Sequence, residues 1–418
     1  MRFYGEYLDK PNLRFDMSST FATHYYSRAG LKRHGPYDFS AFNKDLIKAG
    51  IIYPLNQEQL AHSFMNKLQY GEGQFKGFSQ WFKTKIDFLK EIPVEEEEED
   101  VERAAKELSC EDIDIAFILT SKQKGTVYKC CKSIFSGNGI PCQFLRIERV
   151  FDKNFQWIID NVALATYAKV GGVPWVVEKR INSQDELILG ISRARDKSQK
   201  YIVGFVTIFA QNGEFLLMHS KVPVIEWEKY IDGLEKLILE SYNEYLELRT
   251  EPRKIILHFH KRPGYKELTA VSNALDEIGN IPYALVHLNE FSSIRLFDTS
   301  DQTFVPKKGL KVKLSKKRFL LLLDGRDNGS SRRKVGVPNV LDINIDKRSH
   351  IDWQSDPNEI IKQIYEISHV NWRGFNAKTI PITINYSKLI SRLVVEIGLE
   401  NWNNMISSGK LKNKAWFL

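Results

Sequence analysis

The sequence is poor in cysteine and has no long hydrophobic run. Its 418 residues include four cysteines, Cys110, Cys130, Cys131 and Cys142, which lack the paired CxxC spacing of a zinc site. So few thiols cannot hold a chain of this length together, and we interpret them as reduced thiols. The N-terminal residues carry charges throughout, and the longest apolar runs, such as residues 319–323, are too short to cross a bilayer. We expect a cytoplasmic protein without membrane insertion.

The chain also lacks a large overall charge, but its basic residues are concentrated in one region. Lysine and arginine number 60 against 52 aspartate and glutamate residues, a net charge of +8. Residues 301–350 contain 13 lysines and arginines against 5 aspartates, which equals the excess of the whole chain. Local positive charge of this kind indicates an anionic partner. The acidic run at 95–102 is interpreted as a solvated linker or the start of a helix.

The length favours two domains, and apolar strand-length runs alternate with helical periodicity, which predicts an α/β fold. Residues 112–122 have the continuous apolar character of a buried parallel strand. A helix is predicted from about Thr126, a strand from about Gln143, and a further helix that ends at Lys169. The first half of the chain therefore reads as a doubly wound parallel unit.

The second half begins with a different pattern. Residues 185–220 contain three apolar segments in succession, which is typical of an antiparallel meander. A long helix is predicted at about 226–248, followed by strands at 254–260 and 283–289 with a helix near 265–277 between them. Three adjacent strands followed by alternating helices and strands match the mixed sheet of the ribonuclease H type.

Four residues of the first unit could converge on one anion. Tyr128 and Lys132 are four apart on a predicted helix, Gln143 opens a strand, and Lys169 closes the helix before Gly171. Ligands of open parallel sheets bind at the carboxyl ends of the strands, where helix N-termini attract phosphate. On spacing alone, the lysines could equally be solvated surface charges and Tyr128 could be half-buried packing.

These residues resemble the pocket for the guide 5′ phosphate in the MID domain of Argonaute proteins. The similarity rests on Tyr128-x3-Lys132, Gln143 and "YAKVGGVPW" at 167–175. It extends to "GLKRHGPYD" at 30–38, the block at 368–391 and the final "WFL". Nearly the whole chain resembles the truncated archaeal Argonautes that lack N and PAZ domains. The resemblance implies a Rossmann-like MID domain followed by a ribonuclease H-like PIWI domain. We assign 1–34 to a segment that packs on PIWI, 35–170 to MID and 171–418 to PIWI.

The resemblance also implies a divalent cation, such as Mg²⁺, at the guide 5′ end. In the family the C-terminal carboxylate reaches this pocket, and Leu418 would supply it here. Related truncated proteins can place a glutamine one helical turn before the pocket lysine, whereas this sequence has Ala165. The cation site therefore has one side-chain ligand fewer.

Cleavage by PIWI domains depends on acidic residues that hold two Mg²⁺ ions. By the resemblance, the corresponding positions are Ser192, His260 and the segment around Asn385, none of which is acidic. We therefore expect a binding cleft without slicing activity. His258 and His260 could face the same side of a strand and form an unconventional metal site, although no carboxylate lies nearby in the sequence.

Further residues are predicted to contact the nucleic-acid backbone. Lysines and arginines along a channel neutralise phosphates and leave the choice of sequence to base pairing. The candidates are Asn161, Lys313, Lys316, Lys317, Arg332, Arg333 and Arg373. Any single one of the basic stretch could instead be a solvated surface charge.

Together these features predict an Argonaute that binds a short 5′-phosphorylated guide and a complementary strand without cutting it. From the resemblance we expect an RNA guide and a DNA target, although the reverse remains open. A co-encoded partner with N/PAZ-like structure and an effector would then produce an antiviral or anti-plasmid response. The alternatives are a guide-dependent endonuclease with unconventional ligands and an interaction scaffold that has lost guide binding.

Overall fold

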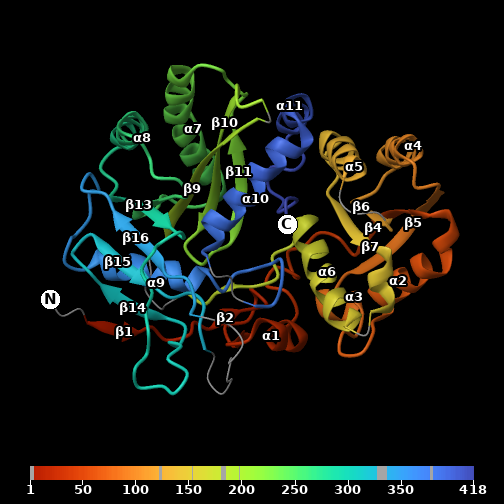
Figure 1. Ribbon diagram of the computed structural model, residues 1–418, viewed down its shortest axis with the longest axis horizontal. Coiled ribbons are helices and arrows are strands. Elements are labelled where there is room, and N and C mark those ends of the chain that lie inside the picture. The colour runs from red at the N-terminus through yellow and green to blue at the C-terminus, as the bar shows by residue number, and fades with distance from the viewer. Residues whose placement is uncertain are drawn as a thin grey trace.

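The fold consists of two α/β units that lie side by side (Figure 1). The structure, a computed structural model, describes residues 4–121, 125–152, 154–179, 185–196, 198–326, 337–376 and 380–418. Each unit has its own sheet, and a third sheet combines two short N-terminal strands with one short strand that follows the smaller unit in the sequence. Within the described ranges, no helix is both long and apolar enough to cross a membrane.

The smaller unit is a parallel four-stranded sheet in the order β5-β4-β6-β7, with helices on both faces. Its elements are β4 (Leu46–Pro54), η1 (Leu55–Gln57), α2 (Glu58–Tyr70), α3 (Phe78–Phe82), β5 (Lys85–Val94), α4 (Glu98–Ser109), β6 (Ile115–Thr120), α5 (Thr126–Gly137), β7 (Cys142–Arg146), η2 (Ile147–Phe151) and α6 (Phe155–Lys169). Helices α4 and α5 cover one face, and α2, α3 and α6 cover the other. The prediction of a doubly wound parallel unit is confirmed, and the acidic run at 95–102 leads into α4.

The larger unit is a mixed nine-stranded sheet in the order β1-β14-β15-β16-β13-β12-β9-β10-β11. Its elements are β9 (Glu186–Arg195), β10 (Ile202–Ala210), β11 (Phe215–Ser220), α7 (Trp227–Leu248), β12 (Lys254–Phe259), α8 (Tyr265–Ile278), β13 (Tyr283–Asn289), β14 (Leu310–Lys313), β15 (Arg318–Leu321), β16 (Leu341–Ile345), α9 (Asp356–Ile367), α10 (Ile382–Ile397) and α11 (Leu399–Ser408). The antiparallel meander β9-β10-β11 and the parallel strands β12 and β13 confirm the ribonuclease H type of sheet. Helices α7 and α8 cover one face, and α9 and α10 the other.

The N-terminal residues contact both units. Strand β1 (Gly5–Tyr7) pairs with β14 and forms an edge of the large sheet. Strand β2 (Leu13–Arg14) pairs with β3 (Thr23–His24) and with β8 (Val176–Val177), which follows α6. Helix α1 (Ser27–His34) also packs against α3 of the smaller unit. The first residues therefore add a strand to the large sheet, while the assignment of 1–34, 35–170 and 171–418 to separate domains stays a prediction.

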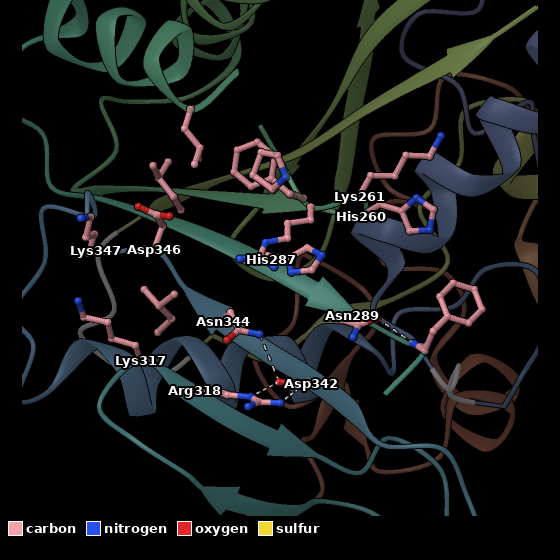
Figure 2. A pocket seen from close by; sticks show the side chains of 17 residues that line it. His260, Lys261, His287, Asn289, Lys317, Arg318, Asp342, Asn344, Asp346 and Lys347 are labelled. Atoms are coloured by element: carbon pink, nitrogen blue, oxygen red, sulfur yellow. Dashed lines mark hydrogen bonds and ion pairs between the residues drawn. The ribbon is translucent and has the colours of Figure 1, made fainter. Parts of the chain in front are cut away.

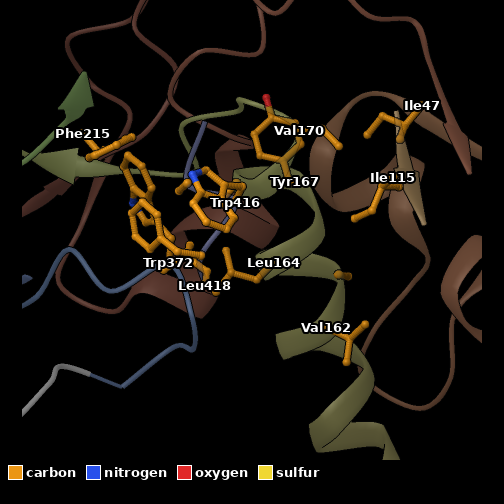
Figure 3. Packing of buried hydrophobic residues seen from close by; sticks show 14 of the residues in the cluster. Ile47, Ile115, Val162, Leu164, Tyr167, Val170, Phe215, Trp372, Trp416 and Leu418 are labelled. Atoms are coloured by element: carbon orange, nitrogen blue, oxygen red, sulfur yellow. The ribbon is translucent and has the colours of Figure 1, made fainter. Parts of the chain in front are cut away.

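A shared hydrophobic core fixes the two units against each other (Figure 3). It includes Leu164 and Tyr167 of α6 together with Phe215, Trp372 and Trp416 of the larger unit. Dense packing of large rings leaves little freedom for the units to shift, because interiors pack as tightly as organic crystals. Clefts at the joint are therefore defined by both units at once.

Candidate nucleic-acid interface

A cleft of 440 Å³ lies where β7, α5 and α6 of the smaller unit meet α10 and the C-terminal residues. We call it the inter-unit cleft. Among its lining residues are Tyr128, Lys132, Gln143, Asn161, Ala165, Lys169, Arg373 and Leu418, all of which the sequence singled out. The four residues expected to hold a phosphate are thus brought to one place from two helices and a strand.

The two lysines of this cleft are almost fully buried. Lys169 is 2% exposed, and its Nζ donates hydrogen bonds to Gln143 Oε1 at 2.6 Å and to the Cys142 carbonyl at 2.9 Å. Lys132 is 4% exposed, and its Nζ lies 5.8 Å from the ring centroid of Trp416. Among the described residues no carboxylate pairs with Lys132. Burying an ammonium without an anion costs several kcal/mol, so the cleft is suited to a negatively charged ligand.

Tyr128 supplies a neutral phenol next to these cations. Its ring packs against that of Phe144, which lines the same cleft, with 4.7 Å between the two ring centroids. Burial raises the pKa of Tyr128, and the nearby Glu396 carboxylate raises it further. The hydroxyl therefore keeps its proton at neutral pH and is suited to donating a hydrogen bond to an anion.

The other predicted residues differ in their exposure and contacts in the wall of the inter-unit cleft. The Asn161 side chain is used locally: Nδ2 donates to the Trp157 carbonyl at 2.6 Å, and Oδ1 accepts from the Phe375 amide at 3.3 Å. Asn161 thus positions the wall, and both ends of its amide are already engaged. Arg373 is exposed at the cleft, whereas Ala165 and Leu418 are buried in its wall.

The sequence did not single out three further lining residues. Trp157 lies on α6, and Arg392 and Glu396 are one turn apart on α10. Their helical spacing indicated a shared face. Nothing in the sequence placed that face against the smaller unit, because this depends on packing between residues more than 200 positions apart.

A second cleft, of 1010 Å³, lies at the carboxyl ends of the parallel strands β12 and β13 (Figure 2). We call it the sheet-edge cleft. Its basic lining residues are Lys261, Arg262, Lys317, Arg318 and Lys347. Arg318 forms a bidentate pair with Asp342: its Nε donates to Oδ1 at 3.0 Å and its Nη2 donates to Oδ2 at 2.7 Å. Within the described residues, Lys261, Arg262, Lys317 and Lys347 form no ion pair, and their charges are suited to phosphates.

The predicted basic stretch is divided by the fold. Lys317 lines the sheet-edge cleft, whereas Lys313 and Lys316 are exposed residues that do not line it. Arg332 and Arg333 lie outside the described residues. Their roles stay predictions, and Lys317 is the member that the structure brings to a cleft.

Two of the positions expected to be degenerate, Ser192 and His260, lie near the carboxyl ends of neighbouring strands, whereas Asn385 lies on α10. The parallel register pairs Gly190 with His258, so Ser192 and His260 follow at matching places beyond the last paired residues. Ser192 and Asn385 are buried, at 6% and 9% exposure. The contacts of His260 come from residues that the sequence did not single out: its Nε2 lies 3.5 Å from Glu290 Oε1, which also accepts from Lys388 Nζ at 2.5 Å.

These residues do not fit a pair of Mg²⁺ ions. The carboxylate nearest His260 is Glu290, whose pKa is held low by the His260 and Lys388 contacts. An ammonium at this position would repel a divalent cation. In the described part of the chain, no group of three His, Cys, Asp or Glu side chains is placed to hold a metal ion.

The histidine pair does not converge on a metal site either. His258 is fully buried, and its Nδ1 lies 2.9 Å from Thr383 Oγ1. Burial lowers the pKa of His258 to about 3, so the ring is neutral at physiological pH. His260 lies past the end of the strand and contacts Glu290 instead.

Comparison with known proteins agrees with this architecture. A family model described as the Piwi domain matches residues 114–325, just over half of the chain. A Piwi protein of Archaeoglobus fulgidus is 24% identical over 406 residues, which cover 93% of each chain. An Argonaute of Cereibacter sphaeroides is 25% identical, over 97% of this chain and 58% of its own length.

The solved structures show the same fold. The Clostridium butyricum Argonaute bound to a guide DNA and a 19-mer target DNA has a TM-score of 0.74 and 18% identity. It is matched over 96% of this chain and 54% of its own. The Marinitoga piezophila Argonaute in complex with a 5′ OH guide RNA has a TM-score of 0.66 and 15% identity, over 93% of this chain and 58% of its own.

Two α/β units joined over a cationic cleft, the second with a ribonuclease H-like sheet, thus match the Argonaute architecture. The chain belongs to the Piwi family. It spans little more than half of the length of the Cereibacter sphaeroides relative and of the solved structures.

Proposed function

We propose that this chain is a non-slicing Argonaute that binds the 5′ phosphate of a short guide in the inter-unit cleft. The guide would then pair with a complementary strand along the sheet-edge cleft. The observation that carries this proposal is the burial of Lys132 and Lys169 beside Tyr128 and Gln143. Two ammoniums and a neutral phenol in a cleft of 440 Å³ suit a terminal phosphate, which is a compact and strongly charged ligand.

A divalent cation at the guide 5′ end is part of the proposal. Glu396 and Leu418 lie in the cleft wall, and a terminal carboxylate on Leu418 would add an oxygen ligand. Guide phosphates would have to complete the coordination, because Ala165 offers no ligand atom. A cation held in this way would screen the carboxylates from the guide phosphate.

The absence of cutting is supported by the Glu290, His260 and Lys388 cluster. Glu290, which lies beside His260, is already paired with the Lys388 ammonium and contacts the His260 ring. We therefore propose that pairing is read out by other proteins. A partner with N/PAZ-like structure and an effector would convert target recognition into defence against invading nucleic acid in the cytoplasm, where the four free cysteines stay reduced.

The test is the affinity for short RNA and DNA guides, each with a 5′ phosphate and a 5′ hydroxyl, for the wild type and for Lys132→Met. Each charge-assisted contact contributes about 1.5–3 kcal/mol, so we expect about a 10- to 150-fold preference for phosphate. The variant should lose most of this preference and keep its affinity for the hydroxyl form. Lys85→Ala, which removes an exposed charge outside both clefts, is the control.

The alternatives give different results. Equal binding of all four oligonucleotides, unchanged by Lys132→Met, would favour an interaction scaffold. Cleavage of a labelled target at a fixed guide position, with Mg²⁺ or Mn²⁺ present, would favour the endonuclease. Cells that carry this gene alone and resist invaders fully would contradict the need for an effector.

A further inference from the structure

A third concavity, of 400 Å³, lies on the other side of α10 from the inter-unit cleft. Its lining residues include Arg193, Arg195, Lys261, Trp227, Ser391 and Val395, and we call it the cationic notch. On α10, Ser391 and Val395 face the notch, while Leu389, Arg392, Leu393 and Glu396 face the inter-unit cleft. The helix therefore separates two cationic sites.

The notch adjoins the sheet-edge cleft, and the two concavities share a lining residue. Lys261 follows the end of β12 and lines both concavities. Figure 2 shows its side chain extending toward α10, away from His287 and Asn344. Together the two concavities form a path along the carboxyl edge of the parallel strands, where ligands of open α/β sheets bind.

The charges of the notch are not balanced within the described part of the chain. Arg193 is paired with Glu267 and lies over the Trp227 ring, 5.2 Å from its centroid. Arg195 donates to the Gln199 carbonyl at 2.7 Å, and Lys261 donates to the Arg193 carbonyl at 3.5 Å. Three cations thus share one carboxylate.

The neighbouring positive charges change the pKa of Lys261. Partial desolvation lowers the pKa of Lys261, and the Arg193 and Arg195 guanidiniums lower it further. An anion in the notch would offset both effects, because it would attract all three cations and replace lost hydration. The geometry and the charge therefore favour the same kind of ligand.

We propose that the cationic notch binds a backbone phosphate of the nucleic-acid strand that runs along the sheet-edge cleft. This inference rests on the proposed function and adds a contact point that is separate from the guide 5′ phosphate. A phosphodiester fits better than a free phosphate because Arg195 and Lys261 are exposed and the notch shares Lys261 with the longer sheet-edge cleft. The half-buried Trp227 gives the strand an apolar wall for a sugar or base.

The test is the double variant Arg195→Ala/Lys261→Ala, with binding measured at several salt concentrations. Two ligands are used: the 5′-phosphorylated guide, and the complementary strand added to guide-loaded protein. We expect about a tenfold loss of affinity near 0.1 M salt for at least one ligand. The slope of log K against log salt should fall by about 0.7–0.9, since this is the contribution of one neutralised phosphate.

Two further variants separate charge from structure. Lys85→Ala/Lys236→Ala removes the same charge from exposed residues that line none of the three concavities, and it should leave the slope unchanged. Arg195→Lys/Lys261→Arg keeps both charges and should keep affinity and slope.

The outcomes are decisive for this site. If the double variant binds both ligands as the wild type does, with the same slope, the notch does not contact phosphate and the inference is overturned. Equal loss in the control pair would also overturn it, because the effect would then be one of overall charge. The preference for a 5′ phosphate over a 5′ hydroxyl reports on the inter-unit cleft alone, so failure of the proposed function would be seen separately.

Discussion

The ion pair between Arg28 and Asp160 ties the N-terminal helix α1 to α6, and its loss should destabilise the protein in a pH-dependent way. Asp160 is 1% exposed, and its Oδ2 lies 2.9 Å from Arg28 Nη2. The Arg28 guanidinium also lies 4.9 Å from the ring centroids of Trp157 and Phe375. The perturbation is Arg28→Met, which keeps apolar volume and removes the charge.

The sign of the pH effect follows from the pKa of Asp160. Burial raises this pKa from 3.8 to about 6, although Arg28 opposes the change. Between about pH 4 and pH 6 the unfolded chain gives up this proton first, so the free energy of unfolding falls as pH rises. In the wild type, a difference of about two pKa units between the folded and the unfolded chain lowers the free energy of unfolding by ~3 kcal/mol over this pH range.

Without Arg28 the pKa of Asp160 in the folded protein should rise further, by about 1–3 units for the loss of an adjacent opposite charge. The decline in stability then continues above pH 6. At pH 5, where the carboxyl is mostly protonated in the folded protein, Arg28→Met should cost about 1–2 kcal/mol from the lost ring contacts. At pH 8, two units above the wild-type pKa, the cost should be greater by ~1.3–2.7 kcal/mol.

The assay is urea unfolding of the wild type and Arg28→Met at pH 5 and pH 8, with hydrogen exchange of α6 amides as a local measure. On an Asp160→Asn background the same substitution should cost about 1–2 kcal/mol at both pH values. An Arg28→Met cost that is equal at pH 5 and pH 8 in the native background would refute the reasoning.

Three other predictions concern packing and charge. Gly172→Ala should destabilise by about 1–3 kcal/mol, because its Cβ would lie 2.3 Å from Tyr167 Cε1; Gly233→Ala, with nothing within 4 Å, should instead stabilise by about 0.5–1 kcal/mol in thermal melts. Trp416→Ala should cost about 3–5 kcal/mol in urea unfolding, since this ring is fully buried in the shared core. Glu290→Gln should cost about 1–2 kcal/mol at pH 7. Because the Glu290 pKa is depressed, this cost should shrink progressively as pH falls below the ordinary value of 4.5, and a cost that does not decrease on acidification would contradict it.

The spacing of apolar residues predicted the helices and strands whose hydrophobic pattern is long and regular. The apolar run of β6 and the spacing of α6 are visible in the sequence because a parallel strand is covered on both faces and a buried helix is apolar all round. Strand β5 was missed, because charged residues and a proline interrupt its apolar pattern: Leu89 is exposed whereas Lys90 is half-buried at the edge of the sheet. Its identity depends on pairing with β4, which is a tertiary contact.

The same distinction applies to the site. Lys132 and Lys169 lie on α5 and α6, the helices before and after strand β7, so their convergence could be inferred. Glu396 and Lys388 reach their sites through the packing of α10, which no local pattern specifies. The rotation of that helix puts Lys388, rather than the buried Asn385, against Glu290.

The two pocket lysines should behave differently when they are replaced. Lys169 has structural partners in the absence of any guide, since its ammonium donates to Gln143 and to the Cys142 carbonyl of β7. It also lies at the C-terminal end of α6, where the helix dipole favours a positive charge. Removing it leaves a buried carbonyl and an amide oxygen without this donor, so Lys169→Met should lower stability as well as phosphate binding.

Lys132 has no such partners in the described structure, and its burial is a cost that a bound phosphate would offset. Lys132→Met should therefore raise the melting temperature of the guide-free protein while it removes the preference for a 5′ phosphate. Opposite effects on stability and binding are expected where a charge is kept for a ligand. If Lys132→Met lowers the melting temperature as much as Lys169→Met does, Lys132 has a structural role and the buried charge is not evidence for an anionic ligand.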